Sequence, residues 1–231
     1  MCIRDRAVAR KTIADCIGAQ PEEIFFTSGG TESDNWAIKG TLQYGDGRAI
    51  LTSQIEHHAI LNACAAVERL GYPVAYLSVD KKGVVTPATL NKVITDNTKL
   101  VSVMLVNNEI GTIEPIKELA EIAHKHGALF HTDAVQAIGH IPVNVDVLGI
   151  DMLSASAHKF NGPKGIGFLY VRKGTDIRSF ADGGAQEFGM RAGTENVASI
   201  VAMAKALRKN CAHIDETESR LRKMENSLIQ A

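Results

Sequence analysis

Lys159 is the residue whose chemistry the sequence indicates most directly. It ends an apolar stretch, follows Ser156 and His158, and precedes the turn Gly162–Gly165. A lysine in that position is costly as a core residue, because charged side chains are rarely buried without a partner. A lysine amine that loses its charge can instead attack a carbonyl group. The pattern fits a Schiff-base lysine, and a surface lysine at a strand end is the alternative.

A Gly-Gly pair earlier in the chain lies at a strand-to-helix junction and suggests an anion site. The segment Thr27–Ser33 reads Thr-Ser-Gly-Gly-Thr-Glu-Ser and follows a short apolar run. Its glycines permit a tight turn, and the free N–H groups of the next helix would face an anion with hydroxyls beside them. The segment is neither a P-loop nor a dinucleotide-binding turn. We interpret it as a phosphate cup, and a capped glycine turn is the alternative.

Three further junctions carry groups that suit a flat, charged ligand. His57 could stack on a ring or move protons, although a histidine that only starts a helix gives the same pattern. Asn107 and Asn108 could bond a ligand oxygen, although turns also favour asparagine. Asp133 follows a buried strand, where a carboxylate is costly unless a cation lies beside it. A protonated pyridine nitrogen would be such a cation.

Metal and disulfide chemistry are not indicated. The chain has no HExxH pattern, and its four cysteines form no CxxC pair. Widely spaced cysteines are typical of reduced thiols in a cytoplasmic protein. We therefore expect no metal ligands and a cytoplasmic location.

Parallel strands that end at one edge of a sheet would bring these junctions together. Short β-branched runs alternate with helical stretches, which predicts an α/β three-layer sandwich with a mostly parallel sheet. The expected strands are 23–27, 49–53, 74–79, 100–106, 128–132, 151–154 and 166–171. The expected helices are 7–18, 31–40, 58–70 and 116–126, together with one that begins at residues 86–87. One long amphipathic helix is expected from residue 197 to the end.

The composition excludes several classes of partner. The 231 residues carry 25 basic and 26 acidic side chains, so the net charge is −1, and no basic stripe or acidic run appears. Neither nucleic acid nor an anionic membrane surface is expected as a partner. No apolar run approaches membrane-spanning length. At 45% apolar residues, the chain can form a sizeable core.

The junctions together supply the parts that hold pyridoxal phosphate: a phosphate cup, a stacking histidine, an amide, a pyridinium partner and a Schiff-base lysine. The ordered set resembles the cysteine desulfurases of the NifS/IscS type, within the class V aminotransferase group of fold-type I pyridoxal-phosphate enzymes. The resemblance covers nearly all of residues 7–230. It rests on Thr27–Ser33, Glu56-His57, Asn107–Gly111, Asp133–Gln136, Ser156–Gly165 and Gly183–Asn196.

The resemblance implies roles for single residues. Lys159, rather than Lys164, would form the Schiff base, and His57 would stack on the cofactor ring and share in catalysis. Asp133 would bond the ring nitrogen. The remaining expected cofactor ligands are Gly30, Thr31, Ser156 and His158 at the phosphate, and Asn108 and Gln136 at the ring hydroxyl. Thr194 would reach the phosphate in the partner subunit, which implies a homodimer.

The resemblance also implies that parts of the family's chain are missing here. The start typical of the family is absent, as are the small domain, the substrate-binding arginine and the loop with the persulfide-forming cysteine. We expect a chain truncated at both ends, with a cofactor-binding large domain over 7–196 and a helix over 197–231 that leads toward the absent small domain. Cys2, Cys16, Cys64 and Cys211 are not expected to act as the nucleophile.

The implied activity is conversion of L-cysteine to L-alanine. The sulfur would pass to an enzyme cysteine for iron–sulfur cluster or thio-cofactor assembly, with a sulfur-acceptor or scaffold protein as a further partner. The fragment by itself is expected to be inactive. The alternatives are another class V enzyme, such as an aminotransferase or a selenocysteine lyase, and a non-catalytic cofactor-binding fragment.

Overall fold

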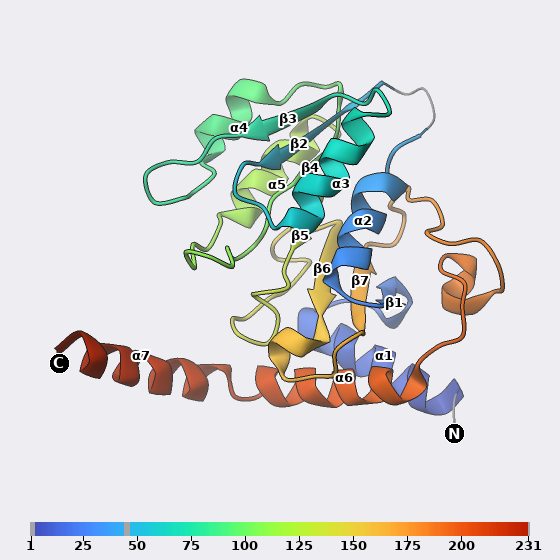
Figure 1. Ribbon diagram of the computed structural model, residues 1–231, viewed down its shortest axis with the longest axis vertical. Coiled ribbons are helices and arrows are strands. Elements are labelled where there is room, and N and C mark those ends of the chain that lie inside the picture. The colour runs from blue at the N-terminus through green and yellow to red at the C-terminus, as the bar shows by residue number, and fades with distance from the viewer. Residues whose placement is uncertain (1–2, 44–46, 231) are drawn as a thin grey trace.

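A seven-stranded sheet forms the centre of the computed structural model, which describes residues 3–43 and 47–230 (Figure 1). Its strands are β1 (Ile24–Thr27), β2 (Ala49–Ser53), β3 (Val74–Leu77), β4 (Thr98–Ser102), β5 (Leu129–Asp133), β6 (Met152–Ser156) and β7 (Gly167–Val171). Their order across the sheet is β1-β7-β6-β5-β4-β2-β3. Strand β7 pairs antiparallel with β1 and β6, and the other pairs are parallel. The predicted mostly parallel α/β sheet is confirmed.

Helices cover both faces of the sheet, as the prediction of three layers requires (Figure 1). They are α1 (Ile3–Ile17), α2 (Gly30–Gly40), α3 (His58–Glu68), α4 (Pro87–Val93), α5 (Ile116–Lys125), α6 (Val197–Cys211) and α7 (Ile214–Gln230). Three short 3-10 helices are η1 (Pro21–Glu23), η2 (Ala157–Phe160) and η3 (Gln186–Gly189). Helices α2 and α3 pack on one face, and α1, α4, α5 and α6 pack on the other.

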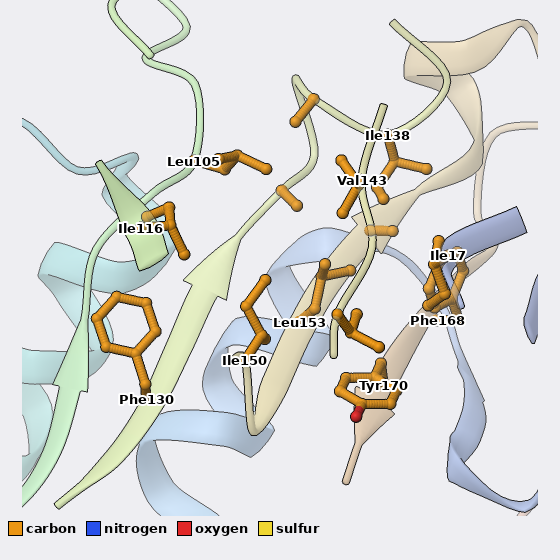
Figure 2. Packing of buried hydrophobic residues seen from close by; sticks show 14 of the residues in the cluster. Ile17, Leu105, Ile116, Phe130, Ile138, Val143, Ile150, Leu153, Phe168 and Tyr170 are labelled. Atoms are coloured by element: carbon orange, nitrogen blue, oxygen red, sulfur yellow. The ribbon is translucent and has the colours of Figure 1, made fainter. Parts of the chain in front are cut away.

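The two faces of the sheet bury separate clusters of apolar side chains. Because side chains alternate along a strand, Phe168 and Tyr170 of β7 join the larger cluster and Leu169 joins the smaller one. The larger cluster also contains Phe130 of β5 and Leu153 of β6 (Figure 2). Strands β4, β6 and β7 are buried over their whole length. All three strands therefore have helices packed on both faces, and the apolar sequence of β7 is typical of a strand in that position.

Strand β4 ends earlier than the sequence predicts. Its regular ladder stops at Ser102, whereas the apolar run continues to Val106. Beyond the strand, the backbone N–H of Val103 donates to the His131 carbonyl and that of Leu105 to the Asp133 carbonyl. The chain therefore continues alongside β5 and buries its apolar residues without strand geometry.

The prediction of one long helix from residue 197 is wrong. Helix α6 ends at Cys211, and α7 begins at Ile214 after a short turn. The Asn210 side chain donates to the Phe160 carbonyl at 2.6 Å, which fastens the end of α6 to η2. The His213 ring donates to the Lys209 carbonyl at 2.8 Å. Such side-chain bonds compete with the helical backbone bonds, so the helix is interrupted here.

Helix α7 differs from the others because it has no buried residue. In Figure 1 it extends away from the sheet and its covering helices. None of the helices in the described part of the chain combines the length and the apolar sequence that a membrane crossing needs.

Candidate active site

A cavity of about 450 Å³ lies where the segments after β1, β2, β4, β5 and β6 meet. The carboxyl ends of parallel strands share one edge of the sheet, so residues distant in sequence come together there. The expected site residues that line it are Gly30, Thr31, His57, Asn108, Asp133, Gln136, Ser156, His158 and Lys159. Thr194 does not line it. Thr194 is exposed in the segment before α6, and its expected role toward a partner subunit stays a prediction.

The Gly-Gly junction forms the start of α2 and one wall of the cavity. Gly29 is the residue before the helix and has φ 150°, a value that favours glycine. A Cβ on Gly30 would lie 2.7 Å from Cγ2 of Val135, so only glycine fits between α2 and the segment after β5. The first N–H groups of α2 lack helical acceptors. They are therefore available to an anion at the Thr31 end of the cavity.

Lys159 lies on η2, directly after β6, rather than on the strand itself. The backbone carbonyl of Lys159 accepts a 2.9 Å hydrogen bond from the His140 ring, which holds this segment in place. The side chain is exposed to the cavity, which Lys164 also lines. Ser156 and Nδ1 of His158 are hydrogen-bonded at 2.9 Å. Burial and the charges of Lys159 and Lys164 lower the pKa of His158, which favours its neutral form.

His57 caps the start of α3, where its Nδ1 accepts the Ala59 N–H at 3.1 Å. Nε2 is then the ring nitrogen that can approach a ligand. The neighbouring Glu56 is buried, and its Oε1 accepts hydrogen bonds from Ser53 Oγ at 2.6 Å and Met104 N–H at 2.9 Å. Glu56 therefore joins the segment after β2 to the segment after β4 and positions His57.

The two asparagines after β4 have different environments. Asn107 is buried, donates to the Ile55 carbonyl at 2.8 Å, and accepts from the backbone of Glu109 and Ile110. Asn108 is exposed, lines the cavity and bonds only the side chain of Glu109 at 2.9 Å among the described residues. Asn107 thus shapes the loop, while Asn108 can reach a ligand.

Asp133 is buried at the end of β5 and faces the cavity. Its Oδ1 accepts the Val135 N–H at 2.9 Å. Burial raises the pKa of Asp133, whereas this hydrogen bond and the cationic forms of His57 and Lys159 oppose the rise. A cationic ligand group in the cavity would therefore stabilise the carboxylate.

Asp34 also faces the cavity, although the sequence pattern did not select it. It lies on α2 with 1% of its surface exposed, and its Oδ1 accepts no hydrogen bond from the described residues. Its carboxylate, that of Asp133 and a ring nitrogen of His57 place one atom each within 4.8 Å of the others. These groups could surround one positively charged atom. A metal ion would meet the same distances, and the expectation of no metal ligand stays a prediction.

Ion pairs connect the segment Gly183–Asn196 to the cavity at Glu32 and to α1 at Arg6 and Arg10. Arg191 binds Glu32 through bonds of 2.8 and 3.1 Å, and Ser28 donates to the same carboxylate at 2.6 Å. Burial opposes ionisation of Glu32, but the bonds from Arg191 and Ser28 outweigh it and lower the pKa. Arg10 of α1 binds the buried Glu187. Because these partners are far apart in the sequence, local patterns could not identify them.

The residues around the cavity fit pyridoxal phosphate. The volume is in the range of small-molecule sites. The glycine cradle at the start of α2 admits a phosphate, and the buried Asp133 at the end of β5 suits a pyridinium nitrogen. Lys159 lines the same cavity.

Comparison with known proteins agrees with this geometry. The family described as aminotransferase class-V matches residues 4–231. The chain belongs to this family. Class-V relatives similar to it include "Cysteine desulfurase IscS" of Methanosarcina thermophila, 55% identical over 96% of this chain and 56% of that protein. The protein of the same name from Dictyoglomus turgidum is 53% identical over 96% of this chain and 57% of that protein.

Solved structures show the same fold. A "NIFS-LIKE PROTEIN" superimposes with a TM-score of 0.96 at 41% identity, over 98% of this chain and 63% of that one. A structure described as "SspA in complex with cysteine" gives a TM-score of 0.85 at 41% identity, over 89% of this chain and 60% of that one. The chain spans little more than half the length of the curated relatives that it matches.

Proposed function

We propose that this class-V chain is the cofactor-binding part of a pyridoxal-phosphate-dependent cysteine desulfurase, which converts L-cysteine to L-alanine. The observation that carries the proposal is the convergence of five strand ends on one cavity that contains Lys159. The names of the relatives and the cysteine complex of SspA support cysteine as the substrate. Residues 7–196 would form the large domain, and the α6–α7 segment would lead from it toward the rest of the protein.

The start of α2 and the end of β6 would hold the phosphate. Gly30 and Thr31 offer backbone N–H groups and a hydroxyl, and the helix N-terminus favours an anion. Ser156 lies beside them, since a Cβ on Gly29 would be 3.6 Å from its Oγ, and His158 also lines the cavity. Because His158 is held by Ser156 Oγ through Nδ1, its Nε2 is the nitrogen that can approach the phosphate.

The segments after β2, β4 and β5 would hold the ring. Asp133 would accept the proton of the ring nitrogen, Asn108 and Gln136 would bond the ring hydroxyl, and His57 would stack on the ring. Bound pyridoxal phosphate supplies a carbonyl that binds amines and a ring that withdraws electrons from the substrate Cα. The buried carboxylate of Asp133 would favour the positive charge at the ring nitrogen, since a fixed opposite charge in a buried site stabilises it strongly.

Lys159 would hold the cofactor and move protons. Its amine is on the cavity wall beside Ser156 and His158, and it can take a proton from the substrate Cα once the substrate amine has displaced it. Both roles require an uncharged amine. His158 precedes Lys159 on η2 and has a lowered pKa that favours the neutral form of its own ring, and Lys164 lines the same cavity.

The sulfur acceptor would come from outside the described residues. Cys16, Cys64 and Cys211 lie on α1, α3 and α6, and none of them lines the cavity. Cys2 lies outside the described residues. We therefore propose that a cysteine in the longer parent receives the sulfur, and that the parent is a cytoplasmic homodimer with Thr194 at the partner's phosphate. An acceptor or scaffold protein would take the sulfur onward.

The proposal is tested by loading the purified chain with pyridoxal phosphate. A visible absorbance band is expected, and borohydride reduction should attach the cofactor to Lys159 in the peptide map. Lys159→Ala should remove the band, and the matched variant Lys164→Ala should keep it. A label on Lys164 would refute the assignment. The parent extended beyond residue 231 should form alanine from L-cysteine without a keto-acid acceptor, whereas an aminotransferase would require one.

A further inference from the structure

Asp34 lies within the cavity, and the roles assigned above do not use it. It is on α2, just below the phosphate cup, with 1% of its surface exposed. Its Oδ1 is buried without a hydrogen-bond donor among the described residues. A buried carboxylate oxygen without a donor is costly. The arrangement therefore requires either a cation beside Asp34 or a proton on it.

No lysine or arginine in the described part of the chain forms an ion pair with Asp34, and two histidines lie near it: His131, and His57, a ring nitrogen of which lies within 4.8 Å of the Asp34 carboxylate. The Nε2 atom of His131 lies 3.9 Å from Asp34 Oδ1. Burial lowers the pKa of His131 to about 3, so the ring is neutral. Its two nitrogens are occupied by Ser102 Oγ at 2.9 Å and Ser154 Oγ at 3.0 Å. His131 thus offers Asp34 no positive charge.

The neighbours of Asp34 on other elements also favour its protonated form. Asp133 on β5 lies within 4.8 Å, and Glu56 after β2 adds a second acidic group. Burial raises the pKa of Asp34 well above its ordinary value, and the charges of Asp133 and Glu56 add to the rise, whereas the Ser154 hydroxyl opposes it. Two buried carboxylates this close cannot both ionise at low cost.

The two carboxyl groups are not equivalent. Asp133 accepts the Val135 N–H at 2.9 Å, and the positive charges of His57 and Lys159 favour its ionised form. Asp34 Oδ1 has no hydrogen-bond donor among the described residues, and although His57 lies within 4.8 Å of both carboxylates, the charges that act on Asp34 are those of Asp133 and Glu56, which disfavour its ionised form. The single negative charge of the pair therefore belongs on Asp133 and the proton on Asp34.

We propose that Asp34 is a positioning residue of the cofactor site: its protonated carboxyl leaves one negative charge on the Asp34–Asp133 pair and keeps that charge on Asp133, opposite the ring nitrogen. The inference rests on the proposed pyridoxal-phosphate function for its purpose. The protonation itself is a property of the chain without cofactor. A charged Asp34 would compete with Asp133 for the ring proton and would leave a second anion buried in the cavity.

Infrared difference spectra of the cofactor-free chain at neutral pH test the protonation. Wild type minus Asp34→Asn should show the carbonyl stretch of a protonated carboxylic acid. The matched control is Glu32→Gln on the same helix, for which the carboxylate bands should be lost instead, because Arg191 keeps Glu32 ionised. EDTA is included, since a bound metal ion would ionise Asp34. Loss of carboxylate bands in Asp34→Asn would overturn the proposal.

Cofactor titration gives the second readout. Asp34→Asn should bind pyridoxal phosphate within about twofold of wild type, because a neutral amide replaces a neutral acid. Asp133→Asn should weaken binding by roughly tenfold or more, because the charged partner of the ring is lost. Equal losses in both variants would refute the proposal. Asp34→Ser replaces Asp34→Asn if the amide variant does not fold.

The two tests separate this inference from the proposed function. A wild-type chain that gives no cofactor band would contradict the proposed function, and the infrared result would still decide whether Asp34 carries a proton. A normal cofactor band with an ionised Asp34 would contradict the inference alone.

Discussion

Replacing Arg10 should destabilise the protein more than any surface charge change, because it leaves Glu187 buried without its cation. The guanidinium donates to Glu187 at 2.7 and 3.0 Å, and both side chains are almost fully buried, at 8% and 2% exposure. It also donates to the Ile24 carbonyl and lies 4.4 Å from the ring centroid of Phe26. Phe26 N–H donates to the same carboxylate at 2.8 Å.

The magnitude follows from the burial of the pair. Removing one partner of a buried ion pair costs about 3–5 kcal/mol, and the lost cation–π contact adds about 0.5–2 kcal/mol. For a chain of this size, each kcal/mol lowers the melting temperature by about 2–4 °C. Arg10→Ala should therefore lower it by at least about 7 °C. Glu187 has φ 46°, a left-handed value, so losing its partner should also loosen the segment before α6.

Urea unfolding and thermal circular dichroism measure the effect. The matched control is Lys11→Ala on the same helix, whose ion pair with Asp15 is 66% and 60% exposed. That pair contributes at most about 1 kcal/mol. The double variant Arg10→Met/Glu187→Leu should be more stable than Arg10→Ala, since it leaves no buried charge. An Arg10→Ala cost no larger than that of Lys11→Ala would refute this reasoning.

Two further predictions concern Glu56 and Gly30. Burial raises the pKa of Glu56 from its ordinary value of 4.5 to about 8. The protonated side chain therefore contributes fully to the free energy of unfolding below pH 4.5, and this contribution is lost as the pH rises through 8. In Glu56→Gln, the decline of the unfolding free energy with pH should be less steep by up to about 1.4 kcal/mol per pH unit. Urea unfolding at several pH values measures this slope, and a slope equal to that of wild type would contradict the prediction. Gly30→Ala should weaken cofactor binding, because its Cβ would lie 2.7 Å from Val135 Cγ2. Gly30→Ala/Val135→Ala should restore affinity, and unchanged affinity in the single variant would contradict the steric argument.

Local patterns were enough to predict the sheet, most helices and the segments that form the cavity. The strands are recognisable because strands buried on both faces are rich in apolar residues, as in β7, Gly167–Val171. The junction residues are recognisable because turns and helix starts favour glycine, asparagine and hydroxyl side chains, as at Gly29-Gly30 and Asn107-Asn108. The pairing of strands at one edge then places these junctions together. Roles for single cofactor ligands came only from the family resemblance.

Other features depend on contacts between distant residues, which no local pattern contains. Asp34 has the sequence appearance of a polar helix residue, and only the packing of α2 against β5 and β6 buries it beside Asp133. Arg10 and Glu187 are 177 positions apart, and their partnership exists only where α1 and η3 meet. The interruption between α6 and α7 coincides with the bond from Asn210 to the Phe160 carbonyl. The charge state of a buried side chain and the end of a helix depend on the groups that surround them in space. Sequence periodicity predicts only which residues face the core.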